Sequence, residues 1–276
     1  MGTWEWDATL FAGSADHYAA GRMPYPAALG EAIGAELGLD GTGRLLDVGC
    51  GPGSLTLLLA PRFAATVGVD ADPDMVAAAR RNAEAAGIGG ITWRHLRAEA
   101  LPAGLGLFRA AVFAQSFHWM DQDLVARRVR DMLEPGGAWV HVGATTHRGE
   151  AGGEALPRPA PPWDRIEALV ARYLGPVRRA GQGRLPNGTR GGEEAVMRRA
   201  GYTGPVRIRV GGGEVVERDE NAIVAAVFSL SSAAPHLFGD ERGAFEADLR
   251  RLLREASPDG RFSERRHATE AVIWRR

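Results

Sequence analysis

The chain has 276 residues, of which 45% are hydrophobic and 24% are charged, and its formal net charge is −1. These fractions are ordinary for a folded globular protein, and a charge near zero gives no reason to expect a nucleic-acid partner. All 33 basic residues are arginine, which excludes Schiff-base chemistry on lysine and a P-loop lysine. A single cysteine, Cys50, excludes an internal disulfide. Since neither a signal peptide nor a long apolar stretch is visible, we expect a cytoplasmic protein with no membrane partner.

Arginine is concentrated between residues 172 and 209. One interpretation is a solvated, locally basic helix surface, which is the more ordinary explanation of such a run. The other is a basic rim that attracts an anion to an active site. The pattern favours the first.

Strands and helices are predicted to alternate through the first half of the chain. The predicted strands are residues 44–49, 65–70, 91–95, 109–114 and 138–142. The predicted helices between them are residues 54–60, 73–86 and 124–133, with Asp72 as the N-cap of the second and Pro135 ending the third. Strands separated by helices indicate parallel pairing through right-handed crossovers.

The alternation ends after residue 142. Residues 145–162 are rich in Gly, Pro and Ala and predict a loop. Helices are expected at residues 163–173, 193–200, 221–230 and 242–256, and strands at residues 206–210 and 269–274. We expect one domain over residues 1–276, in which residues 1–30 form a lid and residues 145–204 form an insertion that covers the substrate.

The most informative local pattern is an acid followed by a glycine-rich turn at Asp47-Val-Gly-Cys-Gly-Pro-Gly53. In open α/β sheets, ligands bind outside the carboxyl ends of the strands, where this turn lies. The spacing G-x-G-x-G differs from the G-x-G-x-x-G of dinucleotide-binding turns. A carboxylate at this place would repel a pyrophosphate but suits a cofactor with an ammonium and a sulfonium group. Asp70 ends the next strand, where nucleoside-binding proteins place an acid for the ribose.

These residues resemble those of class I S-adenosylmethionine-dependent methyltransferases. The resemblance continues through Val69–Met75, Arg97–Pro102, Gln115–Trp119 and Leu133–Gly137, and covers about half of the chain. It implies an α/β, Rossmann-like class I methyltransferase fold. That fold has a mostly parallel seven-stranded sheet, helices on both faces and a small helical cap or insertion. S-adenosylmethionine is the implied cofactor.

More narrowly, the chain resembles a bacterial small-molecule branch that includes trans-aconitate methyltransferase-like proteins. That branch has a Tyr-x-x-x-Arg-x-x-Tyr-Pro element, present here as Tyr18–Pro26, and a Gln-Ser-Phe-His-Trp loop. The usual centre of the first element is Tyr-Arg-Pro, so Gly21 and Met23 are departures. The resemblance implies that the substrate is bound by Tyr18, Arg22, Tyr25 and Trp119. The first three could clamp an anionic group, since arginine suits bidentate recognition of carboxylates.

The resemblance also implies a set of cofactor-binding residues. Its members are Asp47, Gly49, Cys50, Gly51, Gly53, Asp70, Ala71, Met75, Ala98, Glu99 and Gln115. In that set the glycines line the methionine part, and Asp47 holds its ammonium directly or through water. Asp70 binds the ribose hydroxyls, and Gln115 faces the point of methyl transfer. The sequence leaves open whether Met75 and Ala98 are only core residues and whether Glu99 is only an exposed acid of a loop.

Methyl transfer is an in-line displacement, so positioning supplies most of the rate. A base is needed only if the acceptor arrives protonated. His118 is the first candidate for that base, and a histidine that orders its loop is an equal alternative. His17 is the next candidate, if the N-terminal segment folds over the site. No cluster of His and Cys has metal-ligand spacing, so no metal is expected.

The sequence therefore predicts a methyltransferase that acts on O, N or C of a small molecule. A natural-product intermediate and a carboxylate are the acceptors considered. One alternative is a protein of the same fold that binds the cofactor without methyl transfer, such as a cyclase. Another is an RNA methyltransferase, although the sequence has no Asn-Pro-Pro-Tyr element and no appended RNA-binding module.

Overall fold

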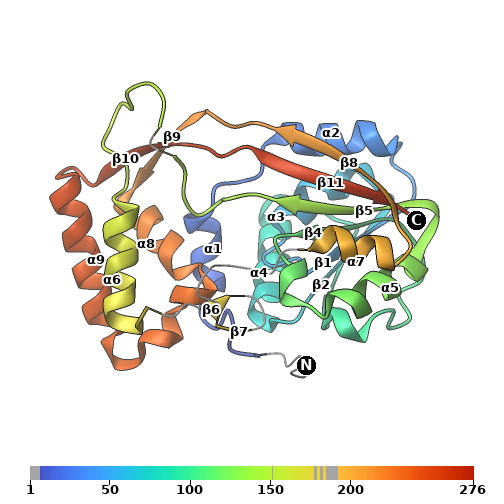
Figure 1. Cartoon of the computed structure of the whole chain (residues 1–276), viewed down its shortest axis with the longest axis horizontal. Helices are drawn as coiled ribbons and strands as arrows, with labels where there is room; N and C mark the ends of the chain where they lie inside the picture. The colour runs from blue at the N-terminus through green and yellow to red at the C-terminus, as the bar shows by residue number, and fades with distance from the viewer. Residues whose placement is uncertain (1–6, 151, 177–178, 181–182, 185–191) are drawn as a thin grey trace.

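A seven-stranded sheet forms one half of the molecule (Figure 1). The computed structural model describes residues 7–150, 152–176, 179–180, 183–184 and 192–276. In spatial order the strands are β3 (Ile91–His95), β2 (Ala65–Asp70), β1 (Arg44–Val48), β4 (Phe108–Ala114), β5 (Leu133–Gly143), β11 (Thr269–Arg275) and β8 (Thr203–Val210). The strands from β3 to β5 are parallel, whereas β11 is antiparallel to both β5 and β8. The expected fold class, a mostly parallel sheet of seven strands, is confirmed.

Helices cover both faces of the sheet, because consecutive side chains of a strand point to opposite faces. Leu45 of β1 packs with α2 (Ala27–Leu37) and α3 (Ser54–Leu59) in one apolar cluster. Leu46 packs in a second cluster with α5 (Gln122–Met132) and α7 (Glu193–Arg199). The centre of this second cluster is the stacked pair Phe113 and Trp139, whose ring centroids are 3.7 Å apart. The sheet therefore has a core on each side, which fixes the carboxyl ends of its strands.

Helix α4 (Pro73–Ala85) has the expected N-cap residue, Asp72. The Asp72 carboxylate accepts hydrogen bonds from the backbone N–H groups of Asp74 (2.8 Å) and Met75 (3.1 Å). The expected end of the fifth strand is found, but its start is not: β5 begins at Leu133, and Pro135 lies within it. Proline is tolerated there because β5 pairs with β4 through Phe108 and Leu133 and then shifts register.

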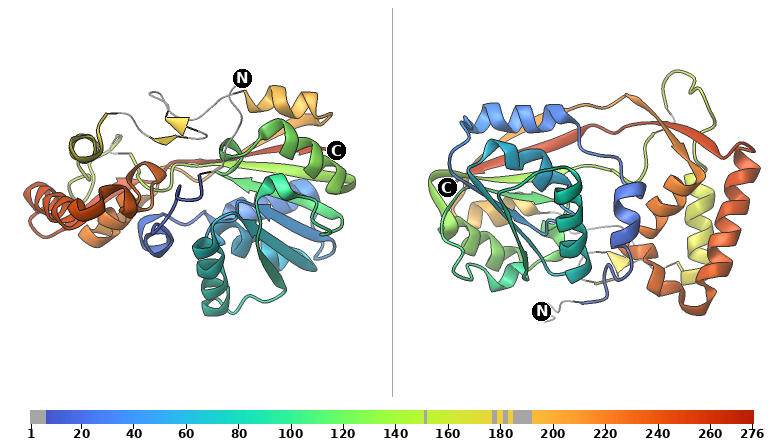
Figure 2. Two further views of the ribbon diagram at one scale, coloured as in Figure 1. Left: turned by 90° about the horizontal axis from the view of Figure 1, so that it is seen from below. Right: turned by 180° about the vertical axis from the view of Figure 1, so that it is seen from behind.

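The other half of the molecule is a helical lobe with a core of its own (Figures 1 and 2). Its elements are α6 (Trp163–Leu174), α8 (Glu220–Phe228), α9 (Arg242–Ala256), and the antiparallel strands β9 (Val215–Asp219) and β10 (Arg261–Arg265). Helix α1 (Ala15–Gly21) packs against α8 of this lobe. Phe228, Phe238 and Phe245 form the centre of the lobe, and the last two rings are stacked 4.0 Å apart. The sequence prediction missed β9 and β10. It also missed α1 and α2.

The remaining elements are short. They are η1 (Ala60–Arg62), η2 (Ala98–Ala100), η3 (Phe117–Trp119), η4 (Ser231–Ala233), η5 (Pro235–Glu241), β6 (Arg179–Ala180) and β7 (Gly183–Arg184). Among the described residues, no single helix has the length and apolar composition needed to cross a bilayer. Only the bent pair Glu220–Phe228 and Ser231–Ala256 meets that test.

The lobe and the expected insertion have different boundaries. Residues 145–204 include α6 of the lobe, but also α7, which contacts α5 on the sheet. The lobe also takes in α8, α9 and the β9–β10 pair, which come later in the chain. Of the expected lid, residues 1–6 lie outside the described residues, and residues 27–30 belong to α2. The division of residues 1–276 into one domain with a lid and an insertion stays a prediction.

Replacing Gly68 by alanine is predicted to destabilise the fold. A Cβ atom at Gly68 of β2 would lie 2.5 Å from the Trp93 ring and 3.3 Å from Cys50 Sγ. Such overpacking costs about 1–3 kcal/mol. Gly89→Ala is the matched control, since a Cβ there meets nothing within 4 Å. Urea unfolding should show the loss for Gly68→Ala only, and equal losses for both variants would contradict this packing.

Candidate cofactor and substrate site

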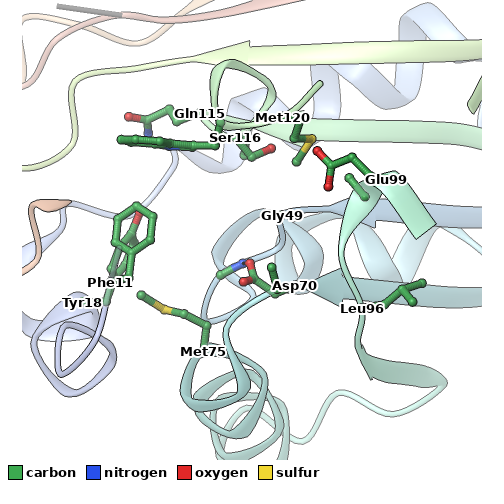
Figure 3. A pocket seen from close by; sticks show the side chains of 15 residues that line it. Phe11, Tyr18, Gly49, Asp70, Met75, Leu96, Glu99, Gln115, Ser116 and Met120 are labelled. Atoms are coloured by element: carbon green, nitrogen blue, oxygen red, sulfur yellow. Dashed lines mark hydrogen bonds between the residues drawn. The ribbon is translucent and has the colours of Figure 1, made fainter. Parts of the chain in front are cut away.

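A cavity of about 650 Å³ opens at the carboxyl ends of β1, β2 and β4, next to α1 (Figure 3). The strand order reverses between β1 and β4, which is where open α/β sheets bind their ligands. The lining residues are Phe11, Tyr18, Gly49, Gly51, Asp70, Ala71, Met75, Leu96, Ala98, Glu99, Ala114, Gln115, Ser116, Trp119 and Met120. Eight of the eleven predicted cofactor residues are in this set.

The turn after β1 brings the backbone close to the cavity. Gly49 has φ +68°, and a Cβ there would lie 2.5 Å from Ser116 Cβ. Ser116 is held beside it, since its hydroxyl donates to the Val48 carbonyl over 2.6 Å. Gly51 has φ +53°, and a Cβ there would meet no protein atom within 4 Å. Gly49 is therefore required by packing, while Gly51 leaves open space that a ligand can occupy.

Two predicted cofactor residues point elsewhere. Cys50 is buried against Val76, Ala79 and Trp93, and its side chain does not line the cavity. The expected packing of Cys50 against the cofactor is thus not found, because the turn directs its side chain toward α4. Gly53 does not line the cavity either. It has φ +85°, and a Cβ there would lie 2.9 Å from the Trp93 ring, so its glycine is explained by that contact.

Asp70 lies at the floor of the cavity (Figure 3). One carboxylate oxygen accepts from the Gly51 N–H over 2.7 Å, and the other accepts from the Asp72 N–H over 2.9 Å. Burial raises the pKa of Asp70 to about 6, against the effect of these two bonds. A carboxylate has about four acceptor sites, so Asp70 can still accept bonds from ribose hydroxyls.

Asp47 lies deeper, under the glycine turn. It is fully buried and does not line the cavity. The Thr56 hydroxyl donates to its Oδ2 over 2.6 Å, but its Oδ1 has no hydrogen-bond partner among the described residues. Burial, with a smaller contribution from the charge of Asp70, raises the pKa of Asp47 to about 7, against the effect of the Thr56 hydrogen bond. An orphaned carboxylate oxygen beside the turn fits a cationic ligand, whose charge it would favour.

One end of the cavity is apolar and suits a flat base. Ala71, Met75, Leu96 and Ala98 line it, and Met75 is also a buried core residue. Glu99 lies at the same end, as Figure 3 shows. Its Oε1 accepts from the Asp121 N–H over 2.9 Å, which holds the carboxylate in place. The structure therefore places these predicted adenine-binding residues together.

The opposite end of the cavity is aromatic. Phe11 and Trp119 meet edge to face with ring centroids 5.6 Å apart, and Tyr18 lies beside Phe11 (Figure 3). Gln115 has φ +53°, unusual for a residue other than glycine, and its amide donates to the Tyr25 hydroxyl over 3.0 Å. Tyr25 is itself outside the cavity lining, and burial raises the pKa of its hydroxyl. Tyr25 therefore orients Gln115 and is not placed to bind substrate directly.

Arg22 does not form the expected clamp for an anion. Its guanidinium donates to the hydroxyl (2.7 Å) and carbonyl (3.0 Å) of Ser229 and to the Thr146 hydroxyl (3.3 Å). It also lies over the Tyr18 ring, 4.8 Å from the centroid. These contacts fix Arg22 between α1 and the lobe, and it does not line the cavity.

Neither predicted base lines the cavity. Burial lowers the pKa of His118 to about 4, with a further contribution from His141, so the imidazole is neutral at pH 7. His17 is on the lobe side of α1, where its ring lies 5.1 Å from that of Phe228. The interpretation of His118 as a histidine that orders its loop agrees with this geometry, and the assignment of His118 or His17 as a base stays a prediction.

Some lining residues were not predicted. They are Phe11, Leu96, Ala114, Ser116 and Met120. Ser116 lies inside the motif that starts at Gln115, so its place could have been inferred. Phe11 lies four residues before Ala15 and seven before Tyr18, a helix-like spacing that could have indicated a shared face.

Ion pairs occupy most described arginine side chains between residues 172 and 209. The pairs are Arg172–Asp248, Arg198–Glu194, Arg199–Asp123, Arg207–Glu194 and Arg207–Glu270. Residues 177–178, 181–182 and 185–191 of that range lie outside the described residues. Acids thus balance the described part of this surface, which favours the interpretation as a solvated helix surface.

Comparisons with known proteins support the cofactor site. Residues 45–137 match a family model described as a methyltransferase domain. A ubiquinone biosynthesis O-methyltransferase from Cereibacter sphaeroides is 35% identical over 98 residues, which are 35% of this chain and 39% of that protein. A demethylmenaquinone methyltransferase from Thermus thermophilus is 38% identical over 100 residues, which are 35% of this chain and 45% of that protein. The chain thus matches less than half the length of these curated relatives.

A solved structure shows that the fold is shared beyond the matched segment. A proposed type II methyltransferase from Anaeromyxobacter dehalogenans has 22% sequence identity and a TM-score of 0.50, and the alignment covers 92% of this chain and 96% of that one. At this identity the likeness concerns the fold alone.

In the protein without ligand, the buried carboxyl group of Asp47 should make the free energy of unfolding depend on pH. Between its ordinary pKa of 3.8 and its folded pKa of about 7, folded Asp47 keeps a proton that the unfolded chain has released. Raising the pH through this window therefore removes stability. His118, His141 and His147 have lowered pKa values and act in the opposite direction, but they are unchanged in Asp47→Asn.

The difference in unfolding free energy, wild type minus Asp47→Asn, should therefore fall as the pH rises from about 4 to about 7. Urea unfolding at a series of pH values measures it. A difference that is constant with pH, or that rises, would contradict the buried, unpaired carboxylate.

Proposed function

Because the chain contains a class I S-adenosylmethionine-dependent methyltransferase domain, we propose that it transfers a methyl group to O, N or C of a small molecule. One observation supports this most: a cavity at the reversal of strand order lies beside two carboxylates, the buried Asp47 and the half-buried Asp70, and neither has an ion-pair partner among the described residues. The two curated relatives, whose names refer to ubiquinone and demethylmenaquinone, support a small molecule as acceptor. The narrower trans-aconitate branch and the cytoplasmic location stay predictions.

In this proposal the cavity divides between cofactor and acceptor. Asp70 accepts bonds from the ribose hydroxyls, and the apolar end at Met75 and Ala98 encloses the adenine. The open space in front of Gly51 would receive the methionine part of the cofactor. The negative charge of Asp47, which lies under the glycine turn, would attract the ammonium group of that part. When bound, the cofactor supplies an electrophilic methyl group on a sulfonium.

The aromatic end of the cavity would receive the acceptor. Phe11, Tyr18 and Trp119 supply ring surfaces, and Gln115 supplies an oriented amide. No arginine is among the residues that line the cavity in the described part of the chain. An uncharged, flat or apolar acceptor therefore fits better than the carboxylate considered from the sequence, because a carboxylate here would lack a cation.

The chain's own residues then act mainly by positioning. The walls at Phe11 and Trp119 hold the acceptor in line with the methyl group and exclude water, and such orientation can supply most of the acceleration. Since no histidine lines the cavity in the described residues, the acceptor's own ionisation would provide the nucleophile.

The cofactor assignment is tested by Asp70→Ala. We expect S-adenosylmethionine to bind at least tenfold more weakly, about 1.4 kcal/mol, because the ribose loses its acceptor. Calorimetry measures the affinity. Asp40→Asn is the control, since this exposed carboxylate lies before β1 and contacts Thr42 and Arg109. Equal affinity of Asp70→Ala and the control would exclude the proposed ribose site.

The role of positioning is tested by His118→Asn. We expect its kcat to stay within about threefold of wild type, whereas losing a general base typically costs 10²–10⁴-fold. The pH profile of kcat should follow the pKa of the acceptor and shift when an acceptor with a different pKa is used. A hundredfold loss at unchanged thermal stability would instead identify His118 as the base.

A further inference from the structure

A buried ion pair in the helical lobe lies far in sequence from every residue of the cofactor cavity. Arg218 of β9 and Glu264 of β10 are 2.8 Å apart, and their side chains are only 6% and 1% exposed. They are diagonal neighbours on the antiparallel pair, in which Arg218 is opposite Phe262 and Glu264 is opposite Val216. Two charges buried to this extent need further hydrogen bonds to remain in place.

Those further bonds join four separate segments of the chain. Besides Glu264, the Arg218 guanidinium donates to the backbone carbonyls of Gly21 (2.7 Å), His147 (2.8 Å) and Ala222 (2.9 Å). The second oxygen of Glu264 accepts from the Gly149 N–H (2.7 Å) and the Trp163 indole (3.0 Å). The bond to Gly21 is the one that reaches toward the cavity, because Gly21 is the last residue of α1.

Helix α1 lies between the lobe and α4 (Figures 1 and 2). Its lobe face contains Ser14, whose hydroxyl donates to the Phe228 carbonyl over 2.9 Å, and Gly21, where a Cβ would lie 2.4 Å from the backbone of α8. Ala15 and Tyr18 pack with Met75 on the neighbouring part of the helix surface. Ser14 and Gly21, seven positions apart, point toward the lobe, Ala15 points about 100° away from Ser14 around the helix axis, and Tyr18 points between these two directions.

We propose that Arg218 and Glu264 are positioning residues for cofactor binding, acting through α1. By holding the carbonyl of Gly21, the last residue of α1, Arg218 fixes the helix that contains Tyr18 and follows Phe11, and these two side chains form one wall of the cavity. The pair is thus a structural link between the lobe and the cofactor site. This inference rests on the proposed function, since it needs the cavity to bind S-adenosylmethionine.

The geometry requires a guanidinium. Its planar fork donates at the same time to one carboxylate and three carbonyls that lie in different directions. A lysine ammonium keeps the charge and can replace the ion pair, but its three donors on one atom cannot reach all four acceptors. A lysine Nζ that takes the place of Nη1 beside Glu264 leaves nothing in the place of Nη2, which holds the Gly21 carbonyl, so Arg218→Lys removes the link to α1 while leaving Glu264 a cation.

The experiment compares Arg218→Lys with a matched control, Arg250→Lys. Arg250 is also a lobe arginine paired with acids, Glu220 (2.9 Å) and Glu246 (2.7 Å), but these contacts lie on α8 and α9 and none reaches α1. Calorimetric affinity for S-adenosylmethionine is measured well below the unfolding temperature of each variant. We expect about fivefold weaker binding or more for Arg218→Lys and no change for Arg250→Lys, even where both lower Tm.

A double-mutant cycle with Tyr18→Ala tests the route through α1. If Arg218 acts through that wall, Arg218→Lys should weaken binding much less in the Tyr18→Ala background than in wild type. Independent effects of the two substitutions would overturn the inference, as would wild-type affinity in Arg218→Lys.

Two further outcomes distinguish a failure of this inference from a failure of the proposed function. If Arg218→Lys does not fold, Gly21→Ala is the substitute variant, because it keeps the ion pair but displaces α1 from α8. We then expect weaker cofactor binding in Gly21→Ala, and wild-type affinity in that variant would overturn the inference. If wild-type protein does not bind S-adenosylmethionine at all, the proposed function fails, independently of what the variants show.

Discussion

The structure depends on two carboxylates at the ends of adjacent strands, the buried Asp47 and the half-buried Asp70, which have no cationic partner among the described residues. Asp47 of β1 is paired with Gly68 of β2, and Asp70 is the last residue of β2. Burial raises the pKa of both carboxyl groups. Burying an unpaired charge is costly unless a partner arrives or the group takes up a proton. A cationic nucleoside would supply the missing charge. The glycine turn between them provides the approach, because Gly51 leaves the space in front of it open.

The second constraint is that the sheet supplies only part of the cavity. Its remaining wall comes from Phe11 and Tyr18, which precede the sheet in sequence but pack with the lobe through α1. The position of the lobe thereby influences the site without contributing its own side chains to the lining. Segments such as α1, held by polar contacts to another layer, are suited to adjusting the fit of a ligand without changing the sheet.

The local patterns predicted the cofactor half of the molecule well, since short apolar strands, Asp72 as an N-cap and the turn at Asp47–Gly53 are determined by nearby residues. The lobe was harder. β9 and β10 pair along their backbones and through Arg218 and Glu264, which are 46 residues apart, and a charged residue in a strand gives no local signal of burial. His118 and Arg22 were predicted from a motif, which specifies the loop but not the direction of each side chain. Such directions follow from long-range packing, as with Arg22 and Ser229.

The most direct test of the cofactor assignment is a parallel calorimetric titration of the unmodified protein with S-adenosylmethionine, S-adenosylhomocysteine and NAD. Asp47 and the G-x-G-x-G turn predict that the first two bind one to one and that NAD does not, because its pyrophosphate would face the carboxylates. Binding of NAD at comparable affinity, or heat from none of the three, would contradict a site selective for a positively charged nucleoside.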